Sequence, residues 1–219
     1  MKQYLSILKQ SQLFSGVGEK EIEAMLSCLN ASEHVYPKGS YVFRQGAHME
    51  HIMILAEGEL LIQNEDYWGN RSIINRVAPG EMFGEAYLAP ESGTILNDVV
   101  AFRDSTVLFF DVRKIMTTCS SACQFHTMVI QNLFFAISEK NRKLVQKLGH
   151  MSRRTTREKL ISYLSDQAKR QNSGNFSIPF NRQQLADFLS VDRSAMSNEL
   201  SKMQKEGLLE FRKNEFRLL

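Results

Sequence analysis

Arginine, serine and asparagine side chains that can donate hydrogen bonds to bases and phosphates lie close together near the C-terminus. Arg193 directly follows Asp192, a residue type that often caps a helix, and Asn198 lies just over one helical turn further on. In a helix that enters the major groove of DNA, arginine pairs with guanine and asparagine with adenine. The buried side of the same helix would carry Met196, Leu200 and Met203. The pattern therefore indicates a helix with one buried side and one side that can read bases.

A second helix must position the first, and the residues before Asp192 predict one. Asn181 is suited to cap it, with Gln184 three residues later as in a capping box, and residues 190–192 break the pattern as a tight turn would. The apolar stripe of this helix would consist of Leu185, Ala186, Phe188 and Leu189. Two short helices over residues 180–209 are typical of a helix-turn-helix. An ordinary helical hairpin on a small core is the alternative.

The last residues of the chain, 208–219, have the pattern of a short hairpin with a basic turn. Phe211 and Phe216 flank Arg212 and Lys213, and Asn214 tolerates the positive φ that a tight turn needs. A hairpin after two helices makes a winged helix, whose wing lies beside phosphates. The predicted DNA contacts are Arg182, Gln183, Arg193, Ser194, Ser197, Asn198, Lys202, Arg212 and Lys213.

A long helical pattern from Phe125 to Met151 precedes these elements. Its apolar residues recur in a heptad register, which predicts that the helix pairs with a second copy in a homodimer. The predicted dimer interface consists of Ile130, Phe134, Ile137, Asn141, Leu144 and Leu148. A second apolar face, expected to pack on the N-terminal part of the chain, consists of Met128, Val129, Leu133 and Phe135. Gly149 is expected to end the helix, and burial of the helix within one chain is the alternative to a dimer.

The N-terminal part of the chain changes from helical to strand periodicity. Residues 5–30 read as short helices, and from Glu33 onward short runs of Val, Tyr, Phe and Ile alternate with glycine turns. We expect strands near residues 33–36, 41–44, 51–56, 59–64, 72–77, 97–102 and 106–111. Regular turns of this kind predict a β roll or barrel. The expected domains are an effector-sensing β roll with N-terminal helices over 1–123, a dimerisation helix over 124–150 and a winged helix-turn-helix over 151–219.

Charge is divided unevenly along the 219 residues. Residues 149–219 hold 13 Lys and Arg against 8 Asp and Glu, a net charge of +5, whereas residues 1–148 hold 14 against 16, a net charge of −2. The basic part thus coincides with the predicted DNA-contacting part. There is no apolar leader and no run long enough to cross a bilayer, so we expect a cytoplasmic protein without membrane contact.

The three cysteines do not form a disulfide framework, which suits a reducing compartment. Cys119, Cys123 and His126 would share one face of a helix, where a metal or redox role competes with simple packing. We favour packing and expect no metal site, because no second close pair accompanies them.

The order of a glycine-punctuated β unit containing Pro79-Gly80-Glu81-Met82-Phe83-Gly84-Glu85, a long helix and Leu185 to Ser197 resembles Crp/Fnr-type bacterial transcription regulators over nearly the whole chain. The resemblance implies an α+β fold with three parts: an N-terminal, double-stranded, cyclic-nucleotide-binding-like β roll, a long dimerisation helix and a C-terminal winged helix-turn-helix. It implies a homodimer that binds a pseudo-palindromic operator in double-stranded DNA, with RNA polymerase as a further candidate partner.

The resemblance also implies an effector site in the β roll, formed by Phe83, Gly84, Glu85, Tyr87, Leu96 and Asn97. Nucleotide-binding relatives place an arginine on the cyclic phosphate about ten residues after the glycine and glutamate, and residues 94–98 here contain no cation. We therefore expect a small-molecule effector other than cyclic AMP. The alternative is that Gly80 to Glu85 only shape turns of the roll.

Two other features of relatives are missing. Oxygen-sensing relatives hold an iron–sulfur cluster on four cysteines, which three cysteines cannot supply, so no cofactor is expected. Many relatives have Glu at the position of Ser194 and Arg at that of Asn198, so the operator sequence stays open.

The sequence as a whole predicts an effector-controlled, sequence-specific DNA-binding transcription regulator rather than an enzyme. No nucleophile, base and orienting group can be assembled, and no phosphate-cradling GxxxxGK[ST] motif occurs. A ligand-binding regulatory or scaffold protein whose winged helix contacts protein is the alternative. A cupin-like enzyme would need more strand histidines than His48 and His51.

Overall fold

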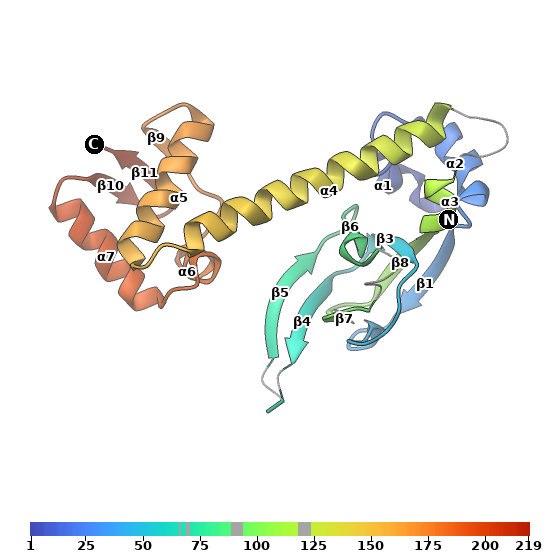
Figure 1. The fold of residues 1–219 in the computed structure, drawn as a ribbon, viewed down its shortest axis with the longest axis horizontal. Coiled ribbons are helices and arrows are strands. Elements are labelled where there is room, and N and C mark those ends of the chain that lie inside the picture. Colours follow the sequence, from blue (N-terminus) through green and yellow to red (C-terminus); the bar gives the residue numbers. More distant parts are fainter. Residues whose placement is uncertain (66, 69–70, 89–93, 118–123) are drawn as a thin grey trace. The chain divides into compact units, whose positions relative to one another are not determined.

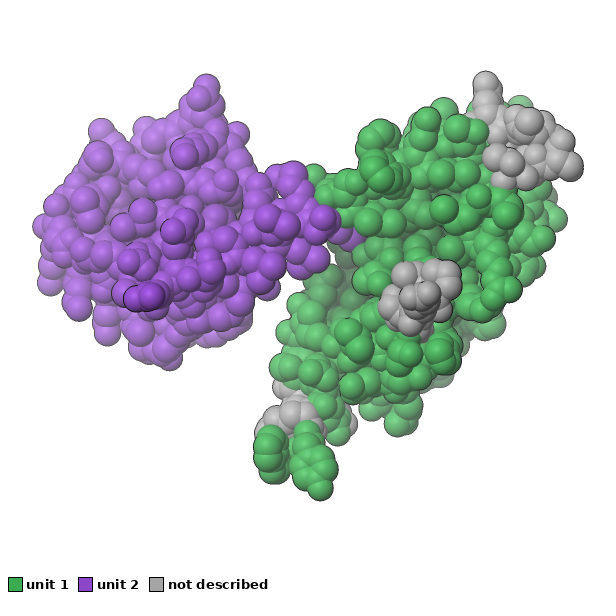
Figure 2. Space-filling model, in the orientation of Figure 1, with its two compact units in different colours: residues 1–139 green, residues 140–219 purple. Residues whose placement is uncertain are grey.

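The computed structural model describes residues 1–65, 67–68, 71–88, 94–117 and 124–219 (Figure 1). The chain forms two compact units, Met1–Glu139 and Lys140–Leu219 (Figure 2). The division falls inside one long helix, so each unit contains one part of that helix. None of the helices in the described ranges is both long enough and apolar enough to cross a membrane.

The N-terminal unit is built on two four-stranded sheets with antiparallel pairing, ordered β1-β8-β3-β6 and β2-β7-β4-β5 in the described part of the chain (Figure 1). The strands are β1 Ser32–Tyr36, β2 Tyr41–Phe43, β3 His51–Glu57, β4 Leu60–Glu65, β5 Arg71–Val77, β6 Met82–Phe83, β7 Asp98–Ala101 and β8 Ser105–Asp111. The seven predicted strands are confirmed within one or two residues. The two-residue β6 was not predicted, because two residues between turns give no periodicity.

The central strands β3 and β8 are apolar without alternation because both of their faces are buried. Ile52, Ile54 and Phe110 point to a core shared with the helices, whereas Met53 and Phe109 point to a core between the two sheets. Ile52 pairs with Phe110 and Met53 with Phe109, so the register places matching faces together. One sheet thus separates the interior of the roll from its helical cover.

The helical cover comes from both ends of the N-terminal unit. It consists of η1 Lys2–Tyr4, α1 Leu5–Gln10, α2 Glu19–Cys28 and the first part of α4 Gln124–Met151. Val129, Leu133 and Ala136 of α4 are buried in this core, and the Asn132 amide donates to the carbonyl of Leu13 at 3.1 Å. The start of α4 is therefore fixed on the unit that contains the roll. The short helices η2 Glu85–Tyr87 and α3 Val112–Met116 complete this unit.

The C-terminal unit packs helices on a small sheet. Its elements are α5 Thr156–Gln171, β9 Asn175–Ser177, α6 Arg182–Leu189, α7 Arg193–Lys205, β10 Leu209–Arg212 and β11 Glu215–Leu218, with the strands ordered β10-β11-β9. Capping boxes begin two helices: Thr155 with Glu158 for α5, and Asn181 with Gln184 for α6. Local sequence thus determines where these helices begin, as predicted for Asn181.

Two expectations for the long helix are wrong. Gly149 does not end α4, which continues to Met151, because the buried His150 still packs on the C-terminal unit. Phe135 does not pack on the N-terminal unit, and 63% of its surface is exposed. It lies two residues after the buried Leu133, and two residues turn a helix by about 200°, so both cannot face the same core.

Candidate DNA-contact surface and effector region

The predicted reading helix α7 has the two sides that the sequence indicates. Met196, Leu200 and Met203 are buried in the core of the C-terminal unit. Of the predicted contacts on α7, four are exposed, namely Arg193, Ser194, Asn198 and Lys202, while Ser197 is partly buried. Four polar side chains therefore line the outer side of one helix, where they can reach bases and phosphates.

The start of α7 is fixed by the turn that precedes it. The Asp192 carboxylate accepts a hydrogen bond from the Ala195 amide at 2.7 Å, which confirms it as the N-cap. Ser190 has φ +51° and reverses the chain after α6, and the Lys159 ammonium donates to the carbonyl of Leu189 at 3.2 Å. These contacts hold the first turn of α7, which carries Arg193, in a defined position.

The back of α7 is held by an ion-pair network to α5. The Arg157 guanidinium binds Glu199 at 2.5 Å and Glu206 at 2.8 Å. The hydrogen bonds to the two carboxylates raise the pKa of Arg157, and the bond from Arg157 lowers the pKa of Glu206. Because one guanidinium binds Glu199 within α7 and Glu206 directly after its last residue, the network restrains the rotation of α7 about its own axis.

The predicted wing is the hairpin of β10 and β11, and Arg212 and Lys213 are exposed at its tip. The turn differs from the prediction in one respect: the positive φ, +54°, falls on Lys213 and not on Asn214. Asn214 instead ties the wing to Ile178, because its carbonyl accepts from the Ile178 amide at 2.9 Å and its side-chain amide donates to the Ile178 carbonyl. Asparagine at this turn therefore provides hydrogen bonds rather than backbone freedom.

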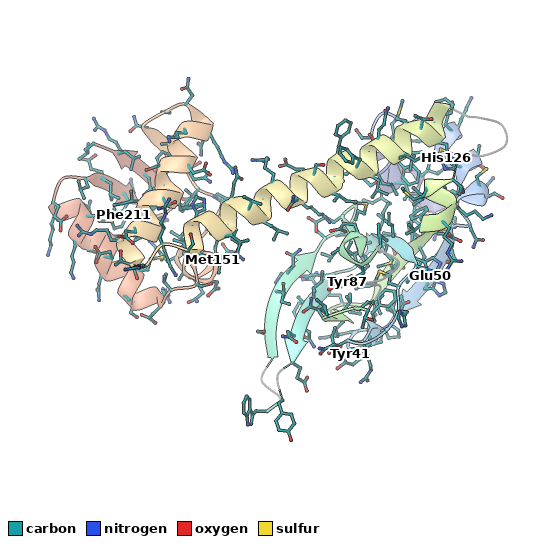
Figure 3. All side chains as sticks on the ribbon, viewed as in Figure 1. Tyr41, Glu50, Tyr87, His126, Met151 and Phe211 are labelled. Atoms are coloured by element: carbon teal, nitrogen blue, oxygen red, sulfur yellow. The ribbon has the colours of Figure 1, made fainter. Side chains whose placement is uncertain are left out.

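The two predicted contacts at the start of α6 lie in different surroundings. The exposed Gln183 side chain donates to the Asp187 carboxylate at 2.8 Å. Arg182 is partly buried over the rings of Phe211 and Phe216, and burial lowers its pKa. The sequence did not indicate this stack, since it joins residues far apart in the chain. Phe211 is labelled in Figure 3.

The outer side of α4 carries apolar side chains that no part of the described chain covers. Phe134, Leu144 and Leu148 are each at least 60% exposed, and Ile137 and Asn141 are exposed as well. Ile130, the remaining residue of the predicted interface, is partly buried against the core of the N-terminal unit. The heptad register did not include Val145, which is 61% exposed and follows Leu144 around the helix.

The predicted effector residues begin with Phe83 at the end of β6 and continue into the turn that follows this strand. Phe83 is buried in the core of the roll, and Gly84 has φ +91°, a conformation that favours glycine. A Cβ atom at Gly84 would lie 2.5 Å from the methyl carbon of Met53, so that flexible side chain would have to shift to admit a larger residue. Glu85 begins the short helix η2 directly after this turn.

Tyr87 and Asn97 of the predicted effector set are brought together. The Asn97 amide donates to the Tyr87 hydroxyl at 3.1 Å, and Figure 3 shows Tyr87 beside the strands of the roll. Leu96 is exposed, and the nearby Asp98 carboxylate accepts a hydrogen bond from the backbone N–H of Gln45 at 2.8 Å. Residues 89–98 contain no Lys or Arg, so this segment itself offers no cation to a phosphate.

His126, which the sequence offered for metal binding, has a ring nitrogen at hydrogen-bond distance from a backbone carbonyl oxygen. His126 is buried, and its Nε2 lies 2.9 Å from the Ile115 carbonyl oxygen. Cys119 and Cys123 lie outside the described residues. Within the described part of the chain, no three His, Cys, Asp or Glu side chains are grouped in a way that would hold a metal ion.

Comparison with known proteins identifies both units. The cyclic nucleotide-binding domain family matches residues 33–122, and the Crp-like helix-turn-helix domain family matches residues 158–219. The chain is 24% identical to the cyclic AMP receptor protein of Thermus thermophilus over 202 residues. The aligned region covers 92% of this chain and 89% of that relative.

Solved structures share the same fold. The catabolite activator protein of Thermus thermophilus superimposes with a TM-score of 0.51 at 21% identity, over 95% of this chain and 94% of that one. The c-di-GMP-responsive global regulator CLP of Xanthomonas campestris gives a TM-score of 0.55 at 19% identity, over 90% of this chain and 97% of that one. With both domain families present in this order, the chain belongs to the Crp/Fnr-type regulators, a family of DNA-binding transcription regulators.

Proposed function

We propose that this protein is a homodimeric, sequence-specific transcription regulator whose DNA affinity is controlled by a small molecule at the β roll. The observation that carries the proposal is the outer side of α7, where Arg193, Ser194 and Asn198 are exposed above a buried apolar side. The basic wing residues Arg212 and Lys213 supply contacts to phosphates. No catalytic role is proposed, and we expect the protein to act in the cytoplasm, where it meets the chromosome.

The proposed roles of α7 in base contacts and of the wing in phosphate contacts can be tested separately. Asn198→Ala should relax base preference at one position of a selected operator, whereas Lys213→Ala should weaken binding to every sequence and lower the salt slope by about 1. Binding is measured on the selected duplex and on a scrambled one over a range of salt. Equal losses on both duplexes for both variants would contradict the assignment.

The alternative function, a winged helix that contacts protein, is an outcome of a simpler experiment. Retention of the purified protein on a DNA column, lost at moderate salt, supports the regulator because phosphate contacts release counterions. Absence of retention together with stable capture of one protein partner supports the alternative. RNA polymerase is a further candidate partner of the regulator, so capture of a protein supports the alternative only when DNA retention is absent.

The proposed dimer uses the exposed apolar stripe of α4. Phe134, Leu144 and Leu148 would pack against their copies, and Asn141 within the stripe would fix register as buried polar residues do in coiled coils. Two-fold symmetry then places two α7 helices on half-sites about one turn of DNA apart, which requires a pseudo-palindromic operator. Under this proposal the chain divides by role into residues 1–123, 124–150 and 151–219.

The proposed effector is a small molecule other than cyclic AMP. The match to the cyclic nucleotide-binding family supports a ligand in the roll, but residues 89–98 contain no cation for a cyclic phosphate and include Asp98. Losing a charge-assisted phosphate contact weakens binding by about 1.5 to 3 kcal/mol. Calorimetric titration should show no micromolar binding of cyclic AMP, and tight binding would overturn this part of the proposal.

A further inference from the structure

Arg182, the first residue of α6, lies across the inner face of the wing. Its guanidinium carbon is 4.8 Å from the ring centroid of Phe211 and 5.2 Å from that of Phe216. The two rings face each other across β10 and β11, and the row continues to Phe176 of β9, with 6.0 Å between neighbouring centroids. One cation of the helix-turn-helix therefore contacts two of the three rings that the strands of the wing sheet contribute to this row.

The charge of Arg182 has no anionic partner among the described residues. Its Nη2 atom is buried and makes no hydrogen bond in that part of the chain. Cations over aromatic faces are stabilised by the ring quadrupole, most strongly where water is excluded. The rings are thus the groups that hold this guanidinium, and its buried Nη2 atom is not available to a phosphate in this arrangement.

The same contact restrains the wing. Phe211 directly precedes Arg212 and Lys213, so a cation that holds the Phe211 ring also limits the movement of the basic tip. The wing has a second attachment through the hydrogen bonds between Asn214 and Ile178. Two attachments, one to α6 and one to the segment before it, orient a hairpin more firmly than either would alone.

We propose that Arg182 is a positioning residue: its stack on Phe211 and Phe216 fixes the wing relative to the helix-turn-helix, so that the wing tip and α7 meet DNA as one surface. The proposal rests on the proposed DNA-binding function. It gives Arg182 a role distinct from that of a direct phosphate contact. The two roles predict different energetic coupling between substitutions at Arg182 and Lys213 in DNA affinity.

A double-mutant cycle separates positioning from direct contact. If Arg182 positions the wing, Lys213→Ala weakens binding to a mixed-sequence duplex about threefold or more in the wild type but less than about twofold in Arg182→Gln, because the tip is already displaced. If Arg182 is an independent phosphate contact, the two losses multiply, which would overturn the proposal. Arg193→Ala on α7 is the matched control, and its loss should multiply with that of Arg182→Gln.

A measurement without DNA keeps this inference separate from the proposed function. Hydrogen exchange of the wing amides over residues 209–218 should be faster in Arg182→Gln and close to wild type in Arg182→Lys, which keeps a cation over the rings. Unchanged exchange in Arg182→Gln would refute the stack as a restraint. Failure of the wild type to bind duplex DNA would instead refute the proposed function and leave the exchange result to decide the role of Arg182.

A second variant covers the case in which Arg182→Gln does not fold. Phe211→Leu retains an apolar side chain but removes the ring, so it should accelerate exchange at the wing and reduce the effect of Lys213→Ala in the same way. Wild-type exchange and full additivity in Phe211→Leu would overturn the proposal.

Discussion

Lys213 combines an unfavourable backbone conformation with an exposed charge at the tip of the wing. Its φ of +54° lies in the left-handed region, which costs a residue with a Cβ atom about 1–2 kcal/mol. Lysine seldom adopts this left-handed conformation, yet Lys213 occupies it at the turn, where the residue is exposed. Glycine at this position removes both the strain and the cation, so the stability of the protein and its DNA affinity should change in opposite directions.

We predict that Lys213→Gly raises the free energy of unfolding by up to about 1 kcal/mol while it lowers DNA affinity and reduces the salt slope by about 1. Urea unfolding and salt-dependent DNA binding measure the two effects. Arg212→Gly is the control: Arg212 ends strand β10, so glycine there should destabilise the wing. A lower unfolding free energy in Lys213→Gly would show that the left-handed conformation is not strained.

Asp192 is the residue on which the start of α7 depends. Its carboxylate satisfies the Ala195 amide at 2.7 Å, and removing such a cap costs about 1 kcal/mol. We predict this loss for Asp192→Ala in urea unfolding, and a larger proportional loss of binding to a selected operator than to random DNA, because Arg193 lies in the released turn. Asp192→Asn keeps a capping oxygen and should retain most of the stability; equal losses in both variants would contradict a capping role.

The end of α4 is attached to α5 through a buried histidine. His150 Nδ1 lies 2.9 Å from the Ser162 hydroxyl, and Nε2 lies 3.8 Å from the Asp166 carboxylate, which also binds Arg170 at 3.0 Å. The ring packs on Tyr163, and only 7% of the surface of His150 is exposed. Burial lowers the pKa of His150 below 6.5. The carboxylate of Asp166 acts in the opposite direction, whereas the cations Arg170 and Arg153 lower the pKa further.

This lowered pKa predicts that acid weakens the attachment of α4. The unfolded chain takes up the proton more readily than the folded one, so the contribution of His150 to stability is present above pH about 6.5 and is lost as the pH falls below that value. The urea midpoint of the wild type should fall between pH about 7.5 and 5.5 by more than that of His150→Asn, which can still bind Ser162 but does not titrate. An identical fall in both proteins would show that other groups are responsible.

The elements that local sequence determines were predicted well, and those that depend on distant contacts were not. Asn181 and Asp192 cap helices because the partner amides lie within three residues, and the apolar runs of β3 and β8 predict buried strands by themselves. Gly149 stays helical because His150 packs on another helix, and the Arg182 stack joins the first residue of α6 to rings of β10 and β11. Neither contact leaves a pattern in nearby residues.

At the scale of the whole molecule, the proposed pairing of α4 in a dimer should let two basic C-terminal units bind the same DNA duplex. Leu144→Glu introduces a charge into the exposed apolar stripe of α4 and should convert the proposed dimer to a monomer in sedimentation equilibrium. Lys143→Gln changes the net charge by the same amount at an exposed neighbouring position about 100° around the helix, so it should remain dimeric. A monomeric wild type would contradict the dimer itself.

The DNA affinity of the monomer then tests whether the two reading helices act together. When two half-sites are bound by one dimer, the second contact is intramolecular, and its loss weakens binding by about 10²-fold or more. Leu144→Glu should therefore bind a duplex with two half-sites at least that much more weakly than the wild type, yet bind a duplex with a single half-site almost equally, because Arg193 and Asn198 are unchanged. The salt slope on the two-half-site duplex should fall to about half, since one set of phosphate contacts is lost. Equal weakening on both duplexes would mean that the substitution damages the winged helix rather than the dimer, and the Lys143→Gln control would then separate this outcome from an effect of charge.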